Sequence, residues 1–416
     1  MKKNLMFIAC LAVVFLSCLF FLSCSNDLED NPPAEPVKIE LTGEEKEIVG
    51  NQNDFSLDLF AALYKQKGED KNSLFSPFSV YCTLGMLANG AVEENLDEIL
   101  SVMNLDGYDR EEMNGYFQKM IEGLEKADPA VKMKIANSIW HNRSVQLKDD
   151  FVRLNKLTYD AEIAALDFSQ PEAAMQRIND WCKDKTEGKI EDLIKKGELS
   201  SETVTVLLNA IYFKARWEKV FSKEDTSDDL FHLSNGQTHT TPFMHKQQIS
   251  FYYSNELFST ITLPYASETY YMRLVLPQEN VSLDDVVSAL ERPGYLNDCL
   301  KDGDQRDVEL ALPKFEIQSE FSLNDALHAA GMNRAFDSLD GFKEMTDTPN
   351  RISKIKQAVC LKVDEEGSEG AAATASINTT SPFFEKAIFK ADRPFLFMIT
   401  ENETGAILFV GTVETL

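Results

Sequence analysis

The segment at 365–384, EEGSEGAAATASINTTSPFF, constrains the fold of this 416-residue chain more than any other part. It separates two stretches that alternate apolar and polar residues as strands do, and about twenty residues is too long for an ordinary hairpin connection. In strand register, alternate residues from Ser368 to Thr374 are small and uncharged, and Glu369 falls on the other face. Such a segment could insert between two existing strands without a steric or charge penalty. A helix or a plain flexible loop also fits its composition.

The rest of the chain alternates helical and strand patterns without repeating. Ser76-Pro77 is a good helix start, because proline is tolerated in the first turn. These patterns predict an α+β protein built around buried sheets. The expected elements are a helix at 53–67, a strand and an apolar helix within 72–91, helices within 96–126, a buried strand at 203–221, strands within 257–276 and 308–321, a helix at 323–332, a strand at 357–365 and a terminal hairpin at 395–413.

The first residues have the pattern of an export signal. Two lysines precede an apolar run, and FLSC at 21–24 is followed by an acidic, proline-rich stretch. This resembles a bacterial lipoprotein signal, with residues 1–23 as the signal peptide and Cys24 as the lipidated residue. The acids after Cys24 resemble a surface-export signal of Bacteroidetes lipoproteins. Residues 24–52 are expected to form a flexible tether. An uncleaved N-terminal anchor is the alternative, and both place the domain outside the cytoplasm.

Under the lipoprotein interpretation, the protein is exported and lipid-anchored at the bacterial outer membrane. It would lie on either the periplasmic or the cell-surface side, held to the membrane through its N-terminal lipid. The net charge of −27 repels polyphosphates and argues against a nucleic-acid partner.

The cysteines and histidines predict neither a disulfide framework nor a metal site. Four cysteines remain beside Cys24 after the signal is removed, with no Cys-x-x-Cys spacing, so buried free thiols are favoured over disulfides. The histidine spacing does not match a helical pair of metal ligands. No nucleophile motif, phosphate loop or dinucleotide fingerprint is found, so neither a cofactor nor an enzymatic activity is expected. The residues concerned are Cys82, Cys182, Cys299, Cys360, His232, His239 and His245.

From about residue 53 to 416 the chain resembles the serpin family of serine protease inhibitors. Nine motifs in the family's order carry the resemblance. They are FSPFSV (75–80), LLNAIYFKARWEKVF (207–221), TTPFMHK (240–246), LPY (263–265) with LVLP (274–277), LALPKFEI (310–317), ISKIKQAV (352–359), DEEGSEGAAATA (364–375), FKADRPFLFMI (389–399) and FVGTV (409–413). The resemblance implies a serpin domain at 53–416 with three β-sheets, about eight or nine helices and an exposed reactive-centre loop.

The resemblance also implies a mechanism. A target serine protease cleaves the reactive loop and forms an acyl-enzyme, and the loop then inserts as a new strand in the central sheet. The insertion distorts the protease, so that the covalent complex persists. Main-chain hydrogen bonds drive the insertion, and strain stored in folding is released. A monomer that is consumed by its target is expected, and not an enzyme.

The family's functional positions transfer to this sequence one by one. Gly367 and Ser368 match the hinge glycine and the small residue after it, whereas Gly370 departs from the usual alanine. Trp217 matches an aromatic residue where insertion begins, and Glu365 matches an acid whose candidate partner is Lys314. The full hinge comprises Glu365, Glu366, Gly367, Ser368, Glu369, Gly370, Ala371, Ala372, Ala373 and Thr374.

A polar cluster is implied beneath the strands that open during insertion. Asn209, Ser76 and Ser79 match it, and Gln357 stands where the family usually has a histidine. Glutamine can still donate and accept hydrogen bonds, so the network could survive with altered strength. For each of these residues, ordinary core packing is the alternative interpretation.

The reactive bond has several candidates. The family's usual count places cleavage after Ser381, but Pro382 follows and most serine proteases cleave poorly before proline. Cleavage at Thr380–Ser381 would suit an elastase-like or subtilisin-like enzyme and is favoured. Cleavage at Phe383–Phe384 would suit a chymotrypsin-like enzyme, but it lies two residues beyond the family's usual position and so adds roughly 7 Å of loop, which weakens distortion of the protease. A trypsin-like target is not expected, because no Arg or Lys lies between Gly367 and Glu385.

Two further functions remain open. A non-inhibitory serpin could act as a surface binding protein, although its hinge would usually carry bulky or charged residues. An unrecognised hydrolase is disfavoured by the missing catalytic motif. Activation by heparin is not expected, because region 92–126 is rich in acids.

Overall fold

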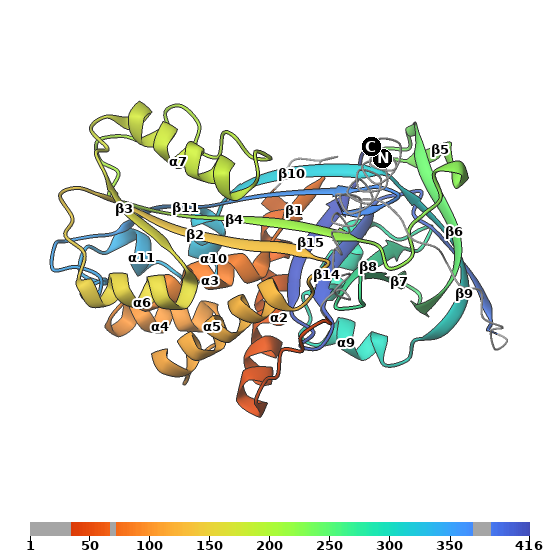
Figure 1. Ribbon diagram of the computed structural model, residues 1–416, viewed down its shortest axis with the longest axis horizontal. Helices are drawn as coiled ribbons and strands as arrows, with labels where there is room; N and C mark the ends of the chain where they lie inside the picture. Colours follow the sequence, from red (N-terminus) through yellow and green to blue (C-terminus); the bar gives the residue numbers. More distant parts are fainter. Residues whose placement is uncertain (1–34, 67–71, 369–383) are drawn as a thin grey trace, which may run out of the picture. The chain divides into compact units, whose positions relative to one another are not determined.

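The computed structural model describes residues 35–66, 72–368 and 384–416 (Figure 1). The chain divides into two units, Met1–Glu35 and Pro36–Leu416, and the description below concerns the second. Within the described ranges, no helix is long and apolar enough to span a membrane.

The first sheet has six strands in the described part of the chain, in the order β10-β11-β4-β2-β3, with β12 paired to β4. Strands β11 and β4 run parallel to each other. Strand β10 is antiparallel to β11, and β2 is antiparallel to β4. The ladder between β11 and β4 ends at Val359 and Ile211, although both strands continue beyond it. The strands are β2 (Lys132–Asn142), β3 (Glu162–Leu166), β4 (Thr205–Arg216), β10 (Phe315–Ser322), β11 (Ile352–Val363) and β12 (Gly367–Ser368).

The second sheet has nine strands among the described residues, in the order β1-β15-β14-β8-β7-β6-β9-β13, with β5 paired to β6. The described residues therefore form two sheets where three were expected. The reason is β6, which pairs in turn with β5, β9 and β7 and so joins two sub-sheets. The strands are β1 (Ser73–Phe75), β5 (Thr226–His232), β6 (Thr238–Ser254), β7 (Phe258–Tyr265), β8 (Tyr270–Pro277), β9 (Asp304–Pro313), β13 (Lys386–Lys390), β14 (Phe395–Glu401) and β15 (Ile407–Val413).

Helices cover both faces of the six-stranded sheet (Figure 1). Helix α3 (Pro77–Ala88) begins at its proline and is buried at every position, as its uniformly apolar sequence predicted. Helix α7 (Pro171–Lys185) packs on the opposite face, against β4 and β2. The other described helices are α2 (Gly43–Gln66), α4 (Glu93–Val102), α5 (Arg110–Lys126), α6 (Asp149–Tyr159), α8 (Leu283–Leu290), α9 (Tyr295–Leu300), α10 (Asn324–Ala329) and α11 (Arg334–Asp337).

The predicted boundary between tether and domain is wrong. Helix α2 begins ten residues before residue 53, and its first turns are packed, because Ile48 and Val49 are buried. Upstream of α2, Ile39 is also buried and lies against Gly123 of α5. The prolines before residue 37 favoured a tether. The helical spacing of Ile48, Val49 and Gln52 is the sequence signal for the earlier start of the helix, and the tether prediction missed it.

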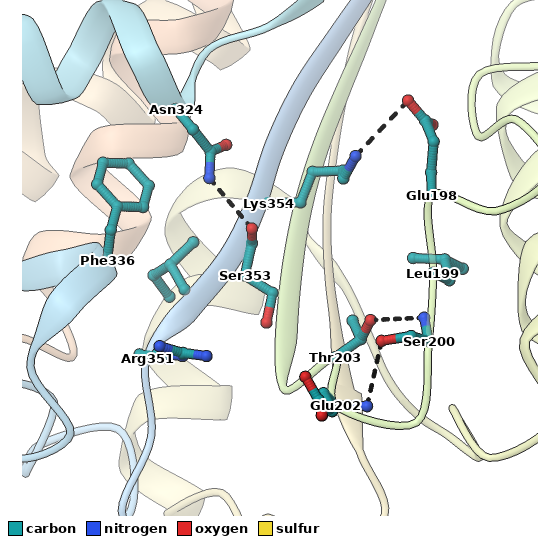
Figure 2. Close-up of a pocket in the computed structure, with 11 residues that line it drawn as sticks. Glu198, Leu199, Ser200, Glu202, Thr203, Asn324, Phe336, Arg351, Ser353 and Lys354 are labelled. Atoms are coloured by element: carbon teal, nitrogen blue, oxygen red, sulfur yellow. Dashed lines mark hydrogen bonds and ion pairs between the residues drawn. The ribbon is translucent and has the colours of Figure 1, made fainter.

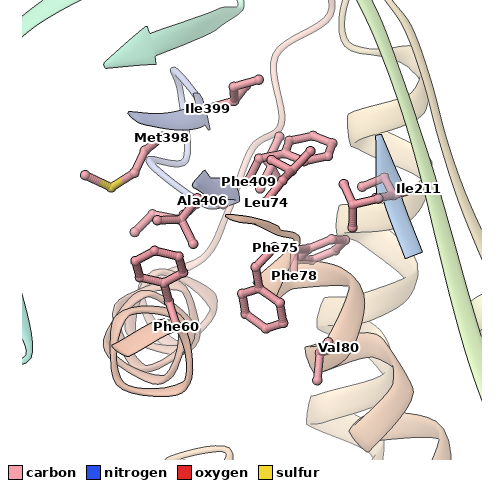
Figure 3. Packing of buried hydrophobic residues seen from close by; sticks show 14 of the residues in the cluster. Phe60, Leu74, Phe75, Phe78, Val80, Ile211, Met398, Ile399, Ala406 and Phe409 are labelled. Atoms are coloured by element: carbon pink, nitrogen blue, oxygen red, sulfur yellow. The ribbon is translucent and has the colours of Figure 1, made fainter. Parts of the chain in front are cut away.

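The core between the sheets is apolar and continuous. Figure 3 shows Phe60 of α2, Phe75 of β1 and Phe78 of α3 packed with Ile211 of β4 and Phe409 of β15. This cluster connects the central strand β4 to the second sheet. Cys82, Cys182 and Cys299 are buried thiols outside any disulfide, as expected; burial raises the pKa of the Cys182 thiol to about 12.

Candidate functional site at the hinge of the six-stranded sheet

The chain folds back on itself directly after β11. Asp364 and Gly367 exchange main-chain hydrogen bonds, with Asp364 N donating to Gly367 O at 2.9 Å and Gly367 N to Asp364 O at 3.2 Å. Strand β12 then pairs antiparallel with the end of β4, with Gly367 opposite Arg216 and Ser368 opposite Ala215. The first two residues after the turn therefore already lie in the sheet, beside the part of β4 that extends beyond its ladder with β11.

Gly367 is required by its position. Its φ of +148° belongs to the region that favours glycine, and a Cβ atom there would lie 2.2 Å from the Ala215 carbonyl oxygen. The hinge glycine of the sequence pattern is therefore explained by the close approach of two backbones.

Ser368 is held by an aromatic pair. Its hydroxyl shares a hydrogen bond of 2.8 Å with the Tyr265 hydroxyl, and both side chains are buried. Tyr265 stacks on Trp217 with ring centroids 4.3 Å apart, and Trp217 Nε1 donates to Asp364 O at 2.9 Å. Burial raises the pKa of Tyr265, so the phenol stays neutral. Trp217 lies at the hinge as expected, whereas Tyr265 was quoted only as part of LPY and its role was missed.

The expected contact between Glu365 and Lys314 is present. Lys314 Nζ lies 2.9 Å from Glu365 Oε2, and the Thr226 hydroxyl donates to Glu365 Oε1 at 2.9 Å. The Glu365 side chain is 7% exposed and that of Lys314 is 37% exposed. Burial alone would raise the pKa of the Glu365 carboxyl, but the hydrogen bonds and charge of its partners outweigh burial and hold it below its ordinary value. Its neighbour Glu366 pairs with the more exposed Lys223.

The predicted polar cluster is divided into two parts. In the first part, Ser76 N donates to Gln357 Oε1 at 2.9 Å, and Gln357 Nε2 donates back to Ser76 O at 2.8 Å. The Ser76 hydroxyl donates to Leu408 O at 2.7 Å. Gln357 thus fastens β11 to the start of α3 through the main chain.

In the second part, Asn209 Nδ2 donates to Asn137 Oδ1 at 2.7 Å, and Asn137 Nδ2 donates to Tyr159 O at 3.0 Å. Asn137 was not identified from the sequence, because its role depends on the pairing of β2 with β4. Asn209 Oδ1 and Ser79 Oγ are buried, and neither has a hydrogen-bond partner among the described residues.

The remaining predicted site residues have no structural test. Phe384 is described and lies just before β13, where it is partly buried. The others lie outside the described residues. They are Cys24, Glu369, Gly370, Ala371, Ala372, Ala373, Thr374, Thr380, Ser381, Pro382 and Phe383.

The connection between α7 and β4 is fastened to β11. Glu198 accepts from Lys356 Nζ at 2.9 Å and lies 3.6 Å from Lys354 Nζ. The Lys356 side chain is 5% exposed, and its Nζ also donates to Leu193 O at 2.6 Å. Figure 2 shows the pocket beside this connection, of roughly 330 Å³, with Glu198 reaching Lys354 across it. Because the same connection continues into β4, it bridges the two strands.

Metal-ligand clusters are not found within the described ranges, where no three His, Cys, Asp or Glu side chains could hold an ion. His245 faces Ser227, and His239 lies 2.9 Å from Leu416 O.

Comparison with known proteins agrees with this geometry. The chain is 34% identical over 374 residues to an uncharacterized serpin-like protein of Thermococcus kodakarensis, covering 89% of this chain and 86% of that protein. It is 32% identical over 372 residues to leukocyte elastase inhibitor A of Rattus norvegicus, covering 86% and 97% respectively.

Solved structures give the same result. The native state of the thermophilic serpin tengpin matches with a TM-score of 0.81 and 30% identity, covering 94% of this chain and 99% of tengpin. Human thyroxine-binding globulin in complex with thyroxine matches with a TM-score of 0.81 and 27% identity, covering 89% and 99%. The family model described as serpin, serine protease inhibitor, matches residues 50–416. The chain therefore belongs to the serpin family, described as serine protease inhibitors, and is not an enzyme.

Proposed function

We propose that this protein is a suicide inhibitor of serine endopeptidases, acting through insertion of its cleaved loop between β4 and β11. The pairing of Gly367 and Ser368 with β4 carries the proposal, because it starts an antiparallel strand where the ladder between β4 and β11 has ended. The residues that follow Ser368 in sequence are small and, apart from Glu369, uncharged as far as Ser376. Insertion would add main-chain hydrogen bonds along β4.

The bond that we propose for cleavage is Thr380–Ser381. Small residues on either side suit an elastase-like or subtilisin-like enzyme, and this bond is not followed directly by a proline. The similarity to leukocyte elastase inhibitor A supports a target of this class. Cleavage at Phe383–Phe384 by a chymotrypsin-like enzyme is the second candidate, and its longer loop would distort the protease less.

The test is incubation of the mature protein with an elastase, a subtilisin and a chymotrypsin, followed by intact mass measurement under denaturing conditions. We expect a covalent adduct and a released peptide that starts at Ser381. A peptide that starts at Phe384 would move the target to chymotrypsin-like enzymes. The matched variant Ala372→Arg should be cleaved without an adduct, because it places a charge on the face of the loop that insertion would bury.

Clean cleavage by all three enzymes, with no adduct and no rise in the melting temperature of the cleaved protein, would contradict inhibition of these targets. Such a result would favour a binding protein with a passive loop. The structural similarity to human thyroxine-binding globulin in complex with thyroxine supports this second candidate.

We also propose that the protein is exported and held at the outer membrane by a lipid on Cys24. The signal-like residues 1–23 and the FLSC box support this. Labelling with a fatty-acid analogue should modify the wild-type protein and not Cys24→Ala, and protease shaving of intact cells should tell the periplasmic from the surface side. Equal labelling of the Cys24→Ala variant would refute lipidation at this residue.

A further inference from the structure

A pocket lies beside the start of β11, where the connection between α7 and β4 runs past it (Figure 2). Its volume of about 330 Å³ is within the range of small-molecule sites and equals a sphere roughly 9 Å across. Residues Arg351 to Lys354 form one wall, and Glu198 to Thr203 form the other. The ladder between β11 and β4 begins here, with Ile352 opposite Thr205. A molecule in the pocket would therefore touch both segments without adding a strand to the sheet.

Two opposite charges in the pocket have no partner in the described part of the chain. The Arg351 guanidinium makes no hydrogen bond or ion pair with a described residue, and neither does the Glu202 carboxylate. Both residues are exposed, so a ligand can reach them from solvent. Glu198 differs, because it already pairs with Lys356 at 2.9 Å and lies 3.6 Å from Lys354 Nζ. Figure 2 shows Arg351 and Glu202 on opposite walls, so the pocket offers a cation on one side and an anion on the other.

Three hydroxyl groups in the pocket have a hydrogen left to donate. Each of these oxygens accepts from a backbone amide: Ser353 Oγ from Val204 N at 2.9 Å, Thr203 Oγ1 from Ser200 N at 3.0 Å, and Ser200 Oγ from Glu202 N at 3.3 Å. A hydroxyl group has one hydrogen to donate, and no acceptor for it is found among the described residues. The amides thus hold the three oxygens in place, and the hydrogens are available to acceptors on a ligand.

These groups match a ligand with a carboxylate at one end, an ammonium group at the other and a carbonyl oxygen between them. The Arg351 guanidinium can donate two parallel hydrogen bonds to a carboxylate, and the Glu202 carboxylate can accept from an ammonium group. The free hydroxyl hydrogens suit a carbonyl oxygen. An extended dipeptide spans roughly 7 Å and so fits across the pocket. A simple anion would meet Glu202 as a like charge, and a simple cation would meet Arg351.

We propose that this pocket binds a short peptide with free ends, of dipeptide length, through its carboxylate on Arg351 and its ammonium group on Glu202. The bound peptide links the start of β11 to the connection that leads into β4. Buried Leu199 and partly buried Phe336 give the pocket an apolar part that accommodates small side chains. The pocket lies where β4 begins, whereas the hinge pairs with the other end of β4, so the site does not rest on the proposed inhibition.

The test titrates the uncleaved protein with the dipeptide Ala-Ala in a calorimeter and measures its melting temperature with and without the peptide. We expect a Kd of about 1–10 mM, and a melting temperature that rises by about 1–3 °C at about 50 mM peptide. Two capped peptides serve as controls at the same ionic strength. N-acetyl-Ala-Ala lacks the ammonium group and Ala-Ala amide lacks the carboxylate, and each should bind at least about fivefold more weakly.

Two variants assign the two ends of the peptide. Arg351→Gln should bind Ala-Ala no more tightly than Ala-Ala amide, and Glu202→Gln should bind it no more tightly than N-acetyl-Ala-Ala. Lys343→Gln removes an exposed charge outside the pocket and should bind Ala-Ala as wild type does. Arg351 and Glu202 make no side-chain hydrogen bond or ion pair with the described residues, so both variants should melt as wild type does without peptide.

The outcomes decide both the charges and the kind of ligand. Equal binding of Ala-Ala and its two capped forms, or no binding by wild type up to about 50 mM, would overturn the proposal. Wild-type affinity for Ala-Ala in both Arg351→Gln and Glu202→Gln would overturn it as well. The probe 6-aminohexanoate carries both end groups without a peptide carbonyl and should bind more weakly than Ala-Ala; equal binding would overturn a peptide as the ligand. No measurement uses a protease, so failure here and failure of inhibition are distinguishable.

Discussion

Replacing Glu365 by glutamine should loosen the hinge much more than the same change at Glu366. The two carboxylates are adjacent in sequence, and each pairs with one lysine at 2.9 Å. They differ in burial, because Glu365 is 7% exposed, whereas Glu366 is 30% exposed and its partner Lys223 is 70% exposed. Burial decides how much an ion pair contributes.

The magnitude follows from that difference. Removing one partner of a fully buried ion pair costs about 3–5 kcal/mol, and an exposed pair contributes about 0–1 kcal/mol. The Glu365 pair lies between these limits, because Lys314 is 37% exposed and glutamine keeps a hydrogen bond. We expect a loss of about 1.5–2 kcal/mol in the free energy of local opening for Glu365→Gln, or about 10–30-fold in the opening equilibrium. For Glu366→Gln we expect the local opening equilibrium to change by less than about threefold.

Amide hydrogen exchange measures this opening directly. The Phe221 amide donates to Glu365 O at 2.9 Å, and the Trp217 amide donates to Glu366 O at 3.0 Å. Both should exchange about 10–30-fold faster in Glu365→Gln than in wild type. Equal acceleration in Glu365→Gln and Glu366→Gln, or a change below about twofold in both, would refute the reasoning from burial.

The pH dependence has a defined sign. The folded-state pKa of Glu365 is depressed below its ordinary value of 4.5, so its contribution is complete above that value. The contribution is lost as the pH falls through the depressed pKa. The exchange rates of wild type and Glu365→Gln should therefore differ at neutral pH and converge in acid.

Three further substitutions test other contacts. Gly367→Ala should displace β12 and lower the free energy of unfolding by about 1–3 kcal/mol. It should also expose the hinge to limited proteolysis, and an unchanged digestion pattern would contradict this. Gln357→Ala leaves the Ser76 amide without its partner, while the Ser76 carbonyl keeps the Val80 amide as a donor. It should lower the free energy of unfolding, measured in urea, by about 1–3 kcal/mol, whereas a loss below about 0.5 kcal/mol would mean that water replaces the side chain. Glu198→Gln removes the charge that faces Lys354 and Lys356 and should lower the thermal unfolding midpoint of the uncleaved protein, whereas Glu202→Gln, from the same pocket, should not; equal midpoints for the two variants would contradict this.

The sequence predicted those parts of the site that depend on local pattern. Alternating small residues after Ser368 indicate which face an inserted strand would bury, and Gly367 is explained by the conformation that only glycine adopts readily. The contact of Glu365 with Lys314 followed from the family resemblance and is present. These features were accessible because each is carried by residue type at a fixed position.

Contacts between distant segments were not accessible in this way. Ser76 and Gln357 were expected in one network with Asn209, but the glutamine amide bonds both main-chain groups of Ser76 and leaves Asn209 to Asn137. Whether Gln357 bonds Ser76 or Asn209 depends on how far its side chain reaches between segments that are far apart in sequence. The link between Tyr265 and Ser368 has the same origin, because it exists only once β12 lies against β4.

If the cleaved loop inserts as proposed, the pairing of β12 also determines where the barrier to insertion lies. Starting a strand from a free loop requires loop closure before any ladder bond forms, and here Gly367 and Ser368 have already made that step. The next inserted residues would pair with the end of β4 that lies beyond its ladder with β11, and from Ile211 onward each further residue would have to separate β11 from β4. Opening this ladder would strain the hydrogen bonds between Gln357 and Ser76 and the ion pairs of Glu198 with Lys354 and Lys356. The rate of insertion should therefore respond more to changes that weaken this ladder than to changes that weaken the first hinge contacts.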